Sequence, residues 1–363
     1  MTIVKKSIAS FILLSVLLYS CSGKKEVQPA LAGFTTEQTL PFDNGYYRVE
    51  ALEEFSPWHD SLLIAPWNKY CTYEMRNNPS NSIGDIFKGD IIRHGKKGQT
   101  EAIFFTKPIT YAQTLWIGMT HDAGQHWEYY FTGLIQGKPL FTKWFSEMSM
   151  ILSDSILQIE AAAMHFSWDW NDFGYKIDKD GLLLTFNLNA LKKDSDKDGL
   201  SDLEELFLQT NPQKPDTDGD GIPDGEDMNP RFKRKDSDVT RLYEAYLNNE
   251  FYEDSCFIPI KSPSAHSTSF TNATETKFII SNDKYLQHAE PDSCRLIILT
   301  EEEHLANESL YDESMFSFSM SITEKEKNAF HLNCNDYHWS MEADIKKTKQ
   351  GWLFDLEYVL MDD

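Results

Sequence analysis

Basic residues are scarce in this sequence relative to acidic ones. The 363 residues include 34 Lys and Arg against 57 Asp and Glu, which gives a formal net charge of −23. A chain with this balance repels phosphate backbones and anionic lipid headgroups. The composition therefore argues against nucleic acid as a partner, and against a membrane surface bound through charge alone.

Catalytic signatures are missing as well. The sequence contains no G-x-S-x-G nucleophile motif, no H-E-x-x-H zinc motif and no P-loop. Its ten histidines are scattered, and 57 acidic residues are too many for a glycosidase carboxylate pair to be picked out. We predict no catalytic residue and no organic cofactor, and a non-enzymatic role is the favoured hypothesis.

Long apolar runs are limited to one segment near the N-terminus. Residues 7–20 form a run of fourteen residues after Lys5 and Lys6, shorter than the about 20 residues a membrane-spanning helix needs. We predict a signal peptide over residues 1–20. Its end, Leu18-Tyr19-Ser20-Cys21, resembles the lipobox of bacterial lipoproteins. The resemblance implies lipid attachment at Cys21, a tether over residues 21–33, and a protein anchored to a membrane of the bacterial cell envelope, periplasmic or surface-exposed.

Cysteine is rare too, with five residues in the whole chain. Apart from Cys21, the cysteines are Cys71, Cys256, Cys294 and Cys334. Four cysteines allow three pairings, and pairing all of them requires a bridge to Cys71, which is alone in its half of the chain. One bridge within the C-terminal half and two thiols is the slightly favoured alternative. Zinc bound by Cys294, Cys334 and His338 is a weak third hypothesis, because no C-x-x-C pair is present.

Residues 194–227 contain two acidic loops with the spacing of calcium sites. In each loop, aspartates at positions one, three and five precede a glycine at position six. Alternate residues of a tight loop direct their carboxylates to one centre, and calcium takes six to eight oxygen ligands. Position seven offers a backbone carbonyl, position nine a direct or water-bridged contact, and position twelve a bidentate carboxylate. The predicted ligands are Asp194, Asp196, Asp198, Leu200, Asp202 and Glu205 in the first loop, and Asp216, Asp218, Asp220, Ile222, Asp224 and Asp227 in the second.

The negative charge of residues 194–227 predicts a structural role for the bound metal. Residues 194–227 carry twelve acidic side chains against Lys197 and Lys214, a net charge of −10. Roughly two or three calcium ions would offset much of this repulsion and order the segment. A solvated acidic linker is the alternative, but two copies in register with glycine at the same offset favour the metal.

The pattern DSDKDGLSDLEELFLQTNP followed by DTDGDGIPDGED resembles thrombospondin type 3 repeats of bacterial surface and periplasmic proteins. The resemblance covers residues 194–230 and implies calcium wrapped by short repeats with little regular secondary structure. The segment before Asp194, GLLLTFNLNALKK, alternates like a strand, whereas an EF-hand needs an entering helix.

Residues 34–193 are rich in aromatic and β-branched runs separated by turn residues, without crossover helices, so we expect an antiparallel β-sandwich-like domain. Residues 178–181, Asp-Lys-Asp-Gly, predict a hairpin turn. The segment from Thr120 to Trp127 resembles one Asp-box of sialidases and related propellers. A single copy indicates a structural turn, in which Asp122 accepts backbone N–H groups and Gly124 takes a positive φ.

Tryptophan is concentrated in the same half of the chain. Seven of nine precede residue 171: Trp58, Trp67, Trp116, Trp127, Trp144, Trp168 and Trp170. An aromatic β core is the favoured explanation, and a glycan-binding platform is the alternative. Residues 168–172, Trp-Asp-Trp-Asn-Asp, are the best local candidate for such a patch.

Residues 231–363 begin with an amphipathic helix at Val239 and continue as strand-like runs, which predicts an α+β domain. The sequence therefore predicts a mainly β fold with a calcium-binding connector between its two domains. The leading hypothesis is a calcium-binding envelope lipoprotein that serves as a binding or scaffold protein. The alternatives are a surface protein that binds or hydrolyses glycans, and an inhibitor or immunity-type lipoprotein with a basic protein partner.

Overall fold

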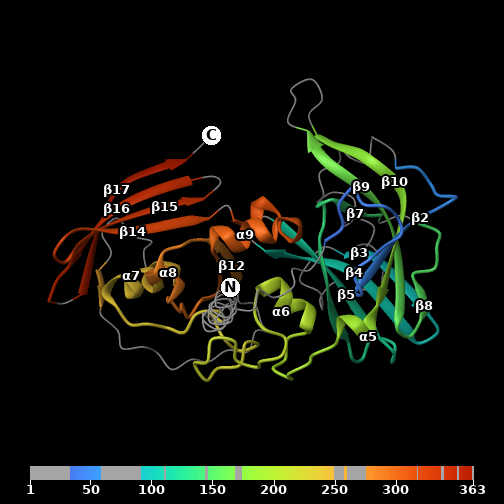
Figure 1. The fold of residues 1–363 in the computed structure, drawn as a ribbon, viewed down its shortest axis with the longest axis horizontal. Coiled ribbons are helices and arrows are strands. Elements are labelled where there is room, and N and C mark those ends of the chain that lie inside the picture. Colours follow the sequence, from blue (N-terminus) through green and yellow to red (C-terminus); the bar gives the residue numbers. More distant parts are fainter. Residues whose placement is uncertain are drawn as a thin grey trace, which may run out of the picture. The chain divides into compact units, whose positions relative to one another are not determined.

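The chain is mainly β, as the sequence predicts, and its N-terminal half forms two antiparallel sheets (Figure 1). The computed structural model describes residues 33–58, 91–109, 112–143, 146–167, 174–248, 257–259, 275–316, 318–336, 339–349 and 351–361. All of these belong to one compact unit, Leu31–Asp363.

The first sheet has the order β1-β2-β10-β9-β7, with β8 paired to β9. Its strands are β1 (Phe42–Asp43), β2 (Tyr47–Ala51), β7 (Leu140–Thr142), β8 (Ile151–Ser153), β9 (Ile156–Ser167) and β10 (Gly174–Asn187). The second sheet runs in sequence order through β3 (Ile91–Lys97), β4 (Thr100–Ile109), β5 (Ala112–Thr120) and β6 (Glu128–Ile135).

The two sheets share one apolar core. Phe104 of β4 and Phe186 of β10 meet with ring centroids 5.6 Å apart. Alternate residues of β4 point the other way, where Ile103 and Phe105 form a smaller cluster with Trp116 and others. Because successive residues of a strand face opposite sides, β4 is buried on both. Packing of this kind is what the sandwich-like prediction requires.

One local prediction is wrong. Residues 178–181 do not form a hairpin turn, because β10 continues through them from Gly174 to Asn187. Its pairing with β9 shifts register between Ile177 and Lys179 and again before Leu182. The turn-forming residues therefore produce bulges within one long strand, where Gly181 takes φ +67°.

The segment between the halves contains more helix than its sequence suggests. The strand predicted up to residue 193 stops at Asn187 and gives way to α5 (Leu188–Leu191). A second helix, α6 (Asp202–Leu208), follows the first acidic loop. Ser201 and Glu204 form a reciprocal capping box at its start, which satisfies backbone N–H groups that the helix itself leaves open.

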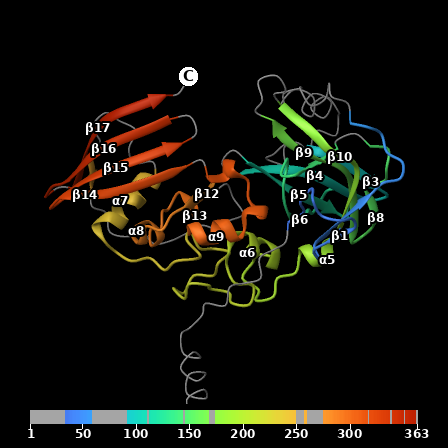
Figure 2. The same cartoon turned by 45° about the horizontal axis from the view of Figure 1, so that its top comes forward.

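The C-terminal half is α+β (Figure 2). Its antiparallel sheet has the order β11-β17-β16-β15-β14. The strands are β11 (Phe257–Pro259), β14 (Ser319–Glu326), β15 (Ala329–Asp336), β16 (Trp339–Lys347) and β17 (Gly351–Met361). The predicted amphipathic helix is α7 (Asp238–Leu247), and the short α9 (Glu301–Ala306), η1 (Glu308–Leu310) and η2 (Glu313–Phe316) follow further along.

A parallel pair, β12 (Glu275–Ile280) and β13 (Cys294–Leu299), is joined through α8 (Lys284–Gln287). Its two faces serve different cores. Phe278, Ile297 and Leu299 belong to the core shared with the N-terminal sheets, whereas Ile279 and Ile298 belong to the core under the C-terminal sheet. The pair therefore links the two hydrophobic cores of the unit.

Several predictions fall outside the described residues. They are the signal peptide and Cys21, four of the tryptophans (Trp67, Trp144, Trp168 and Trp170), Cys71, Cys256 and His338. Cys294 and Cys334 are both buried in the C-terminal core. Within the part of the chain that is described, no helix has the length and apolar character needed to cross a membrane.

Candidate metal centre

Each acidic loop is folded around its first aspartate. Asp194 accepts the N–H of Lys197 (2.6 Å) and of Gly199 (3.3 Å), and Asp216 accepts those of Gly219 (2.7 Å) and Gly221 (2.9 Å). These donors turn the chain back over the carboxylate, and all four have positive φ, from +69° at Lys197 to +107° at Gly221. The sixth-position glycines thus stand where the backbone requires them.

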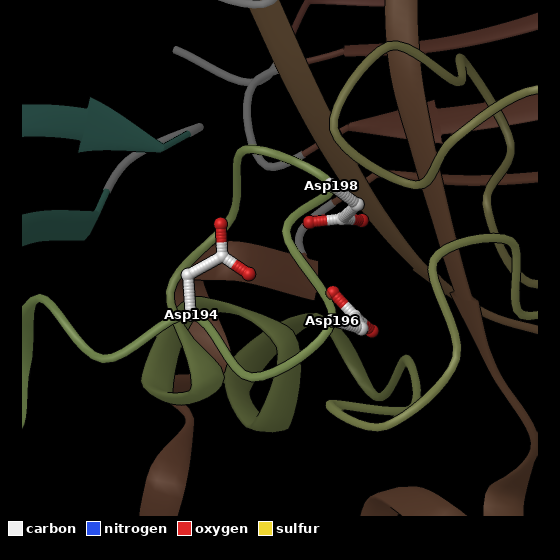
Figure 3. Close-up of side chains that lie close together, drawn as sticks. All are labelled: Asp194, Asp196 and Asp198. Carbon is white, nitrogen blue, oxygen red and sulfur yellow. The ribbon is translucent and has the colours of Figure 1, made fainter.

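The structure brings carboxylates together in three groups whose oxygen atoms lie within 4.8 Å of one another. The groups are Asp194, Asp196 and Asp198; Asp216, Asp218 and Asp220; and Asp198, Glu205 and Asp224. Figure 3 shows the first, with three carboxylates turned toward one another across the loop. Among the described residues these groups are the candidate metal sites, and the third joins the two loops.

Several carboxylate oxygens of the two acidic loops are buried without a hydrogen-bond partner. They are both carboxylate oxygens of Asp196 and of Glu205, and the Oδ2 atoms of Asp218 and Asp227. Glu205 is 0% exposed and Asp227 is 2% exposed. A buried carboxylate is costly unless it is paired or coordinates a metal. The donor set consists of hard oxygens at loop spacing and fits calcium.

Burial and mutual repulsion raise the carboxyl pKa values. Burial, with the charges of Asp196 and Asp198, raises the pKa of Glu205 to about 9. Burial likewise raises the pKa of Asp227 to about 8 and those of Asp218 and Asp224 to about 6. The charged form of each is therefore disfavoured until a cation offsets it.

Asp216 behaves differently from these four carboxyls. Burial alone would raise its pKa, but the donated N–H groups of Gly219, Gly221 and Asp220 outweigh burial and lower it. Asp216 is therefore stabilised as a carboxylate by its own loop, before any metal is considered.

The ninth-position aspartates close their loops. Asp202 accepts the N–H (2.7 Å) and hydroxyl (2.9 Å) of Ser195, and Asp224 accepts those of Thr217 (2.7 and 2.6 Å). Only Asp224 also belongs to one of the three groups, while Asp202 pairs with Lys193.

The predicted carbonyl ligands are placed by their neighbours. The N–H groups of Leu200 and Ile222 donate to Asp198 and Asp220, both over 2.8 Å. Leu200 also packs into the main core. Coordination by their carbonyls, like that by each carboxylate, stays a prediction.

Arg295 of β13 holds the second loop, and the sequence reasoning missed it. Its buried guanidinium donates to the carbonyl oxygens of Asp224 (3.0 Å) and Gly225 (2.8 Å). Burial lowers its pKa to about 10, while the charges of Asp227 and Glu204 act in the opposite direction. Arg295 lies 68 residues beyond Asp227, so no local pattern could have announced it.

Other contacts fasten the segment to the C-terminal half. Asn229, which donates its N–H to Asp227, gives its side-chain amide to the carbonyl oxygens of Gln287 (2.8 Å) and Ala289 (2.7 Å). Arg231 donates to Gln209 and pairs with Glu303 of α9 at 2.7 Å.

Helix α6 carries the apolar side of the same segment. Phe207 meets Phe131 of β6 at 4.9 Å between ring centroids, Phe278 of β12 at 5.7 Å and Tyr311 at 5.4 Å. The hydroxyl of Tyr311 donates to the carbonyl oxygen of Phe207 over 2.7 Å. Helix α6 therefore makes the acidic segment part of the main hydrophobic core.

The Asp-box-like segment has the hydrogen bonds expected of a structural turn. Asp122 accepts the N–H groups of Gln125 (3.0 Å) and His126 (2.9 Å), and Gly124 takes φ +88°. Trp127 packs against the small cluster around Phe105. Backbone and ring donation from His126 lowers the pKa of Asp122.

Comparisons with known proteins single out this segment. No curated protein and no solved structure matches the chain. Residues 194–215 and 216–226 match a family model described as a bacterial TSP3 repeat. Such repeats imply calcium binding and indicate an extracytoplasmic protein. The chain thus carries a bacterial TSP3 repeat segment over residues 194–226.

Proposed function

We propose that the protein is an envelope lipoprotein in which calcium, bound by residues 194–227, holds the N-terminal sheets and the C-terminal half in one rigid unit. The observation that carries this proposal is that the same segment buries both unpartnered carboxylate oxygens and an apolar side chain of the main core. Carboxylate oxygens of Asp196, Glu205 and Asp227 are buried without hydrogen-bond partners, while Phe207 of the same segment packs in the main core.

The physical reason is electrostatic. A segment with a net charge of −10 repels itself, and burying it next to an apolar helix makes that repulsion worse. Calcium removes both penalties at the same point, so binding free energy becomes folding free energy. The role of the ion is therefore structural, and the rest of the molecule serves as a non-enzymatic binding or scaffold protein.

Thermal unfolding in millimolar calcium and in excess chelator tests this role. Each ion at a hundredfold excess over its dissociation constant adds about 2.7 kcal/mol of stability, so the melting temperature should rise clearly with calcium. Protease should cut residues 194–227 faster in chelator than in calcium. Asp198→Ala combined with Asp220→Ala should abolish both calcium effects. Equal melting temperatures with and without calcium would reject the proposal.

Anchoring through Cys21 is part of the same proposal and has its own test. The lipobox-like sequence before Cys21 and the preceding apolar run support it. The wild-type chain should incorporate a labelled fatty acid and fractionate with membranes, and Cys21→Ala should lose both properties. Release of the wild-type chain in soluble form would contradict the anchor without affecting the calcium proposal.

The partner of the scaffold is proposed to be a glycan or a protein. The strongly acidic balance supports a basic protein surface, and the tryptophan content supports a glycan. A glycan array and a pull-down at low and high salt separate the two. Capture that is lost at high salt identifies the protein partner, whereas glycan binding would persist.

A further inference from the structure

The second repeat touches the first at the turn formed by Asp224 and Gly225. The N–H of Gly225 donates to Oδ2 of Asp198 over 3.2 Å. A Cβ atom added to Gly225 would lie 2.5 Å from the carbonyl oxygen of Asp198. Since a side chain cannot approach backbone that closely, glycine at position 225 allows direct contact between the two repeats.

At this contact, oxygens of Asp198, Glu205 and Asp224 lie within 4.8 Å of one another. Because Ca–O distances are about 2.3–2.6 Å, one calcium ion can contact all three. Asp198 and Glu205 stand at positions five and twelve of the first loop, whereas Asp224 stands at position nine of the second.

Glu205 supplies independent support for a cation here. Its side chain is 0% exposed, and neither carboxylate oxygen has a hydrogen-bond partner. Helix α6 directs this carboxylate toward Asp198 and Asp224 instead of toward solvent. A carboxylate in that position needs a positive charge, and no basic side chain pairs with it among the described residues.

The two ninth positions form a natural comparison. Asp202 and Asp224 bind the residue at position two of their own loop in the same way, through its N–H and hydroxyl groups. Loop closure therefore accounts for both side chains equally. Only Asp224 is also placed beside ligands of the other repeat, so its position there requires a second explanation.

We propose that the calcium site of the first repeat takes one ligand from the second repeat, the carboxylate of Asp224, and that the two repeats bind calcium as a coupled pair. The inference rests on the proposed function, in which residues 194–227 bind calcium. Filling the first site fixes the turn at Asp224 and Gly225. The second loop then has less disorder to lose when its own ion binds, which is positive cooperativity.

Calorimetric calcium titration of the whole chain tests the shared ligand. Asp218→Asn with Asp220→Asn disables the second loop, so that the remaining binding reports the first site. In this background Asp224→Asn should weaken binding by about tenfold or more, because calcium affinity follows the number of charged ligands. Asp202→Asn should weaken it less. Glu226→Gln removes the same charge from an exposed neighbour and should change affinity by less than about twofold.

Gly225→Ala tests the coupling with every carboxylate retained. In the otherwise wild-type chain it should separate the repeats, weaken the first site and remove the cooperativity of the titration. Asp224→Asn with unchanged first-site affinity, or an effect no larger than that of Asp202→Asn, would overturn the shared ligand. A wild-type chain that binds no calcium would instead reject the proposed function. Far-ultraviolet circular dichroism of each variant checks that it is folded.

Discussion

At the scale of single residues, the glycines of the two loops are required for backbone conformation rather than for space. Gly199 and Gly221 have φ of +99° and +107°, and a Cβ added to either would meet nothing within 4 Å. Gly225 is the opposite case, in which a close contact with Asp198 excludes a side chain. The loop motif encodes the first kind of glycine, because that need is local to the turn.

Gly221→Ala should therefore weaken calcium binding without disturbing any neighbour. An L-residue held at positive φ costs about 1–2 kcal/mol, which corresponds to about a tenfold loss of affinity if the strain falls on the calcium-bound state. Calorimetric titration of the variant and the wild-type chain measures the difference. An unchanged affinity would mean that the loop relaxes to another conformation when it binds the ion.

Arg295 should contribute strongly to the stability of the second loop. Its replacement by Met removes the donor to the carbonyl oxygens of Asp224 and Gly225, and the positive charge that interacts with Asp227 and Asp224. A buried acceptor left without its donor costs about 1–3 kcal/mol, so Arg295→Met should lower the free energy of unfolding by about that amount for each carbonyl oxygen.

Urea denaturation in saturating calcium measures this loss. Arg48→Met is the control, because Arg48 pairs with Glu50 at 2.7 Å on the surface, with 46% and 40% of their side chains exposed. An exposed pair contributes about 0–1 kcal/mol, so the control should stay near wild type. Equal losses in the two variants would mean that Arg295 contributes no more than a surface pair.

At the scale of elements, the sequence predicts most strands and the C-terminal helix but not the helices around the first loop. Runs of β-branched and aromatic residues locate β4, β5, β6, β9 and β13, because strand periodicity is a local signal. Ser201 and Glu204 have the spacing of a capping box, which is a local helix signal. The resemblance of the surrounding loops to type 3 repeats predicts little regular structure there instead, so α6 is not expected.

The same distinction between local and distant contacts holds for the candidate metal site. Spacing alone groups the aspartates within each loop, because those contacts span only a few residues. The contact of Asp224 with the first repeat and the anchoring by Arg295 depend on how distant segments pack. The parallel pairing of β12 with β13 was likewise missed, since nothing in either strand specifies the direction of its partner.

Helix α6 yields the prediction at this scale. Phe207 contacts rings from the N-terminal sheet and from the C-terminal half at once. Phe207→Ala should lower the free energy of unfolding by about 3–5 kcal/mol through lost burial and the cavity left behind. Leu206→Ala, at a partly buried position of the same helix, should cost less. Urea unfolding measures both, and equal costs would contradict the role of Phe207 as the link between the halves.

At the scale of the whole unit, two linkages join the halves of the chain. One is apolar and runs from β6 through Phe207 to β12, whose other face belongs to the C-terminal core. The other is polar and runs from the backbone carbonyl oxygens of Asp224 and Gly225 in the second loop through Arg295 to β13. Both end on the pair β12–β13, so the metal and the two cores act on the same element.

Calcium removal should therefore be felt in the pair β12–β13 and not only in the acidic loops. Without the ion the carboxylates around Glu205 and Asp227 repel one another, the second loop loosens, and Arg295 loses the backbone that it holds. Amide hydrogen exchange reads such local opening segment by segment. In chelator, exchange should accelerate in α6 and β13 as well as in residues 194–227. The hairpin β14–β15, which has no described contact with the loops, should change least. Acceleration confined to the loops would show that the cores hold together without the ion, and calcium would then order the repeats alone.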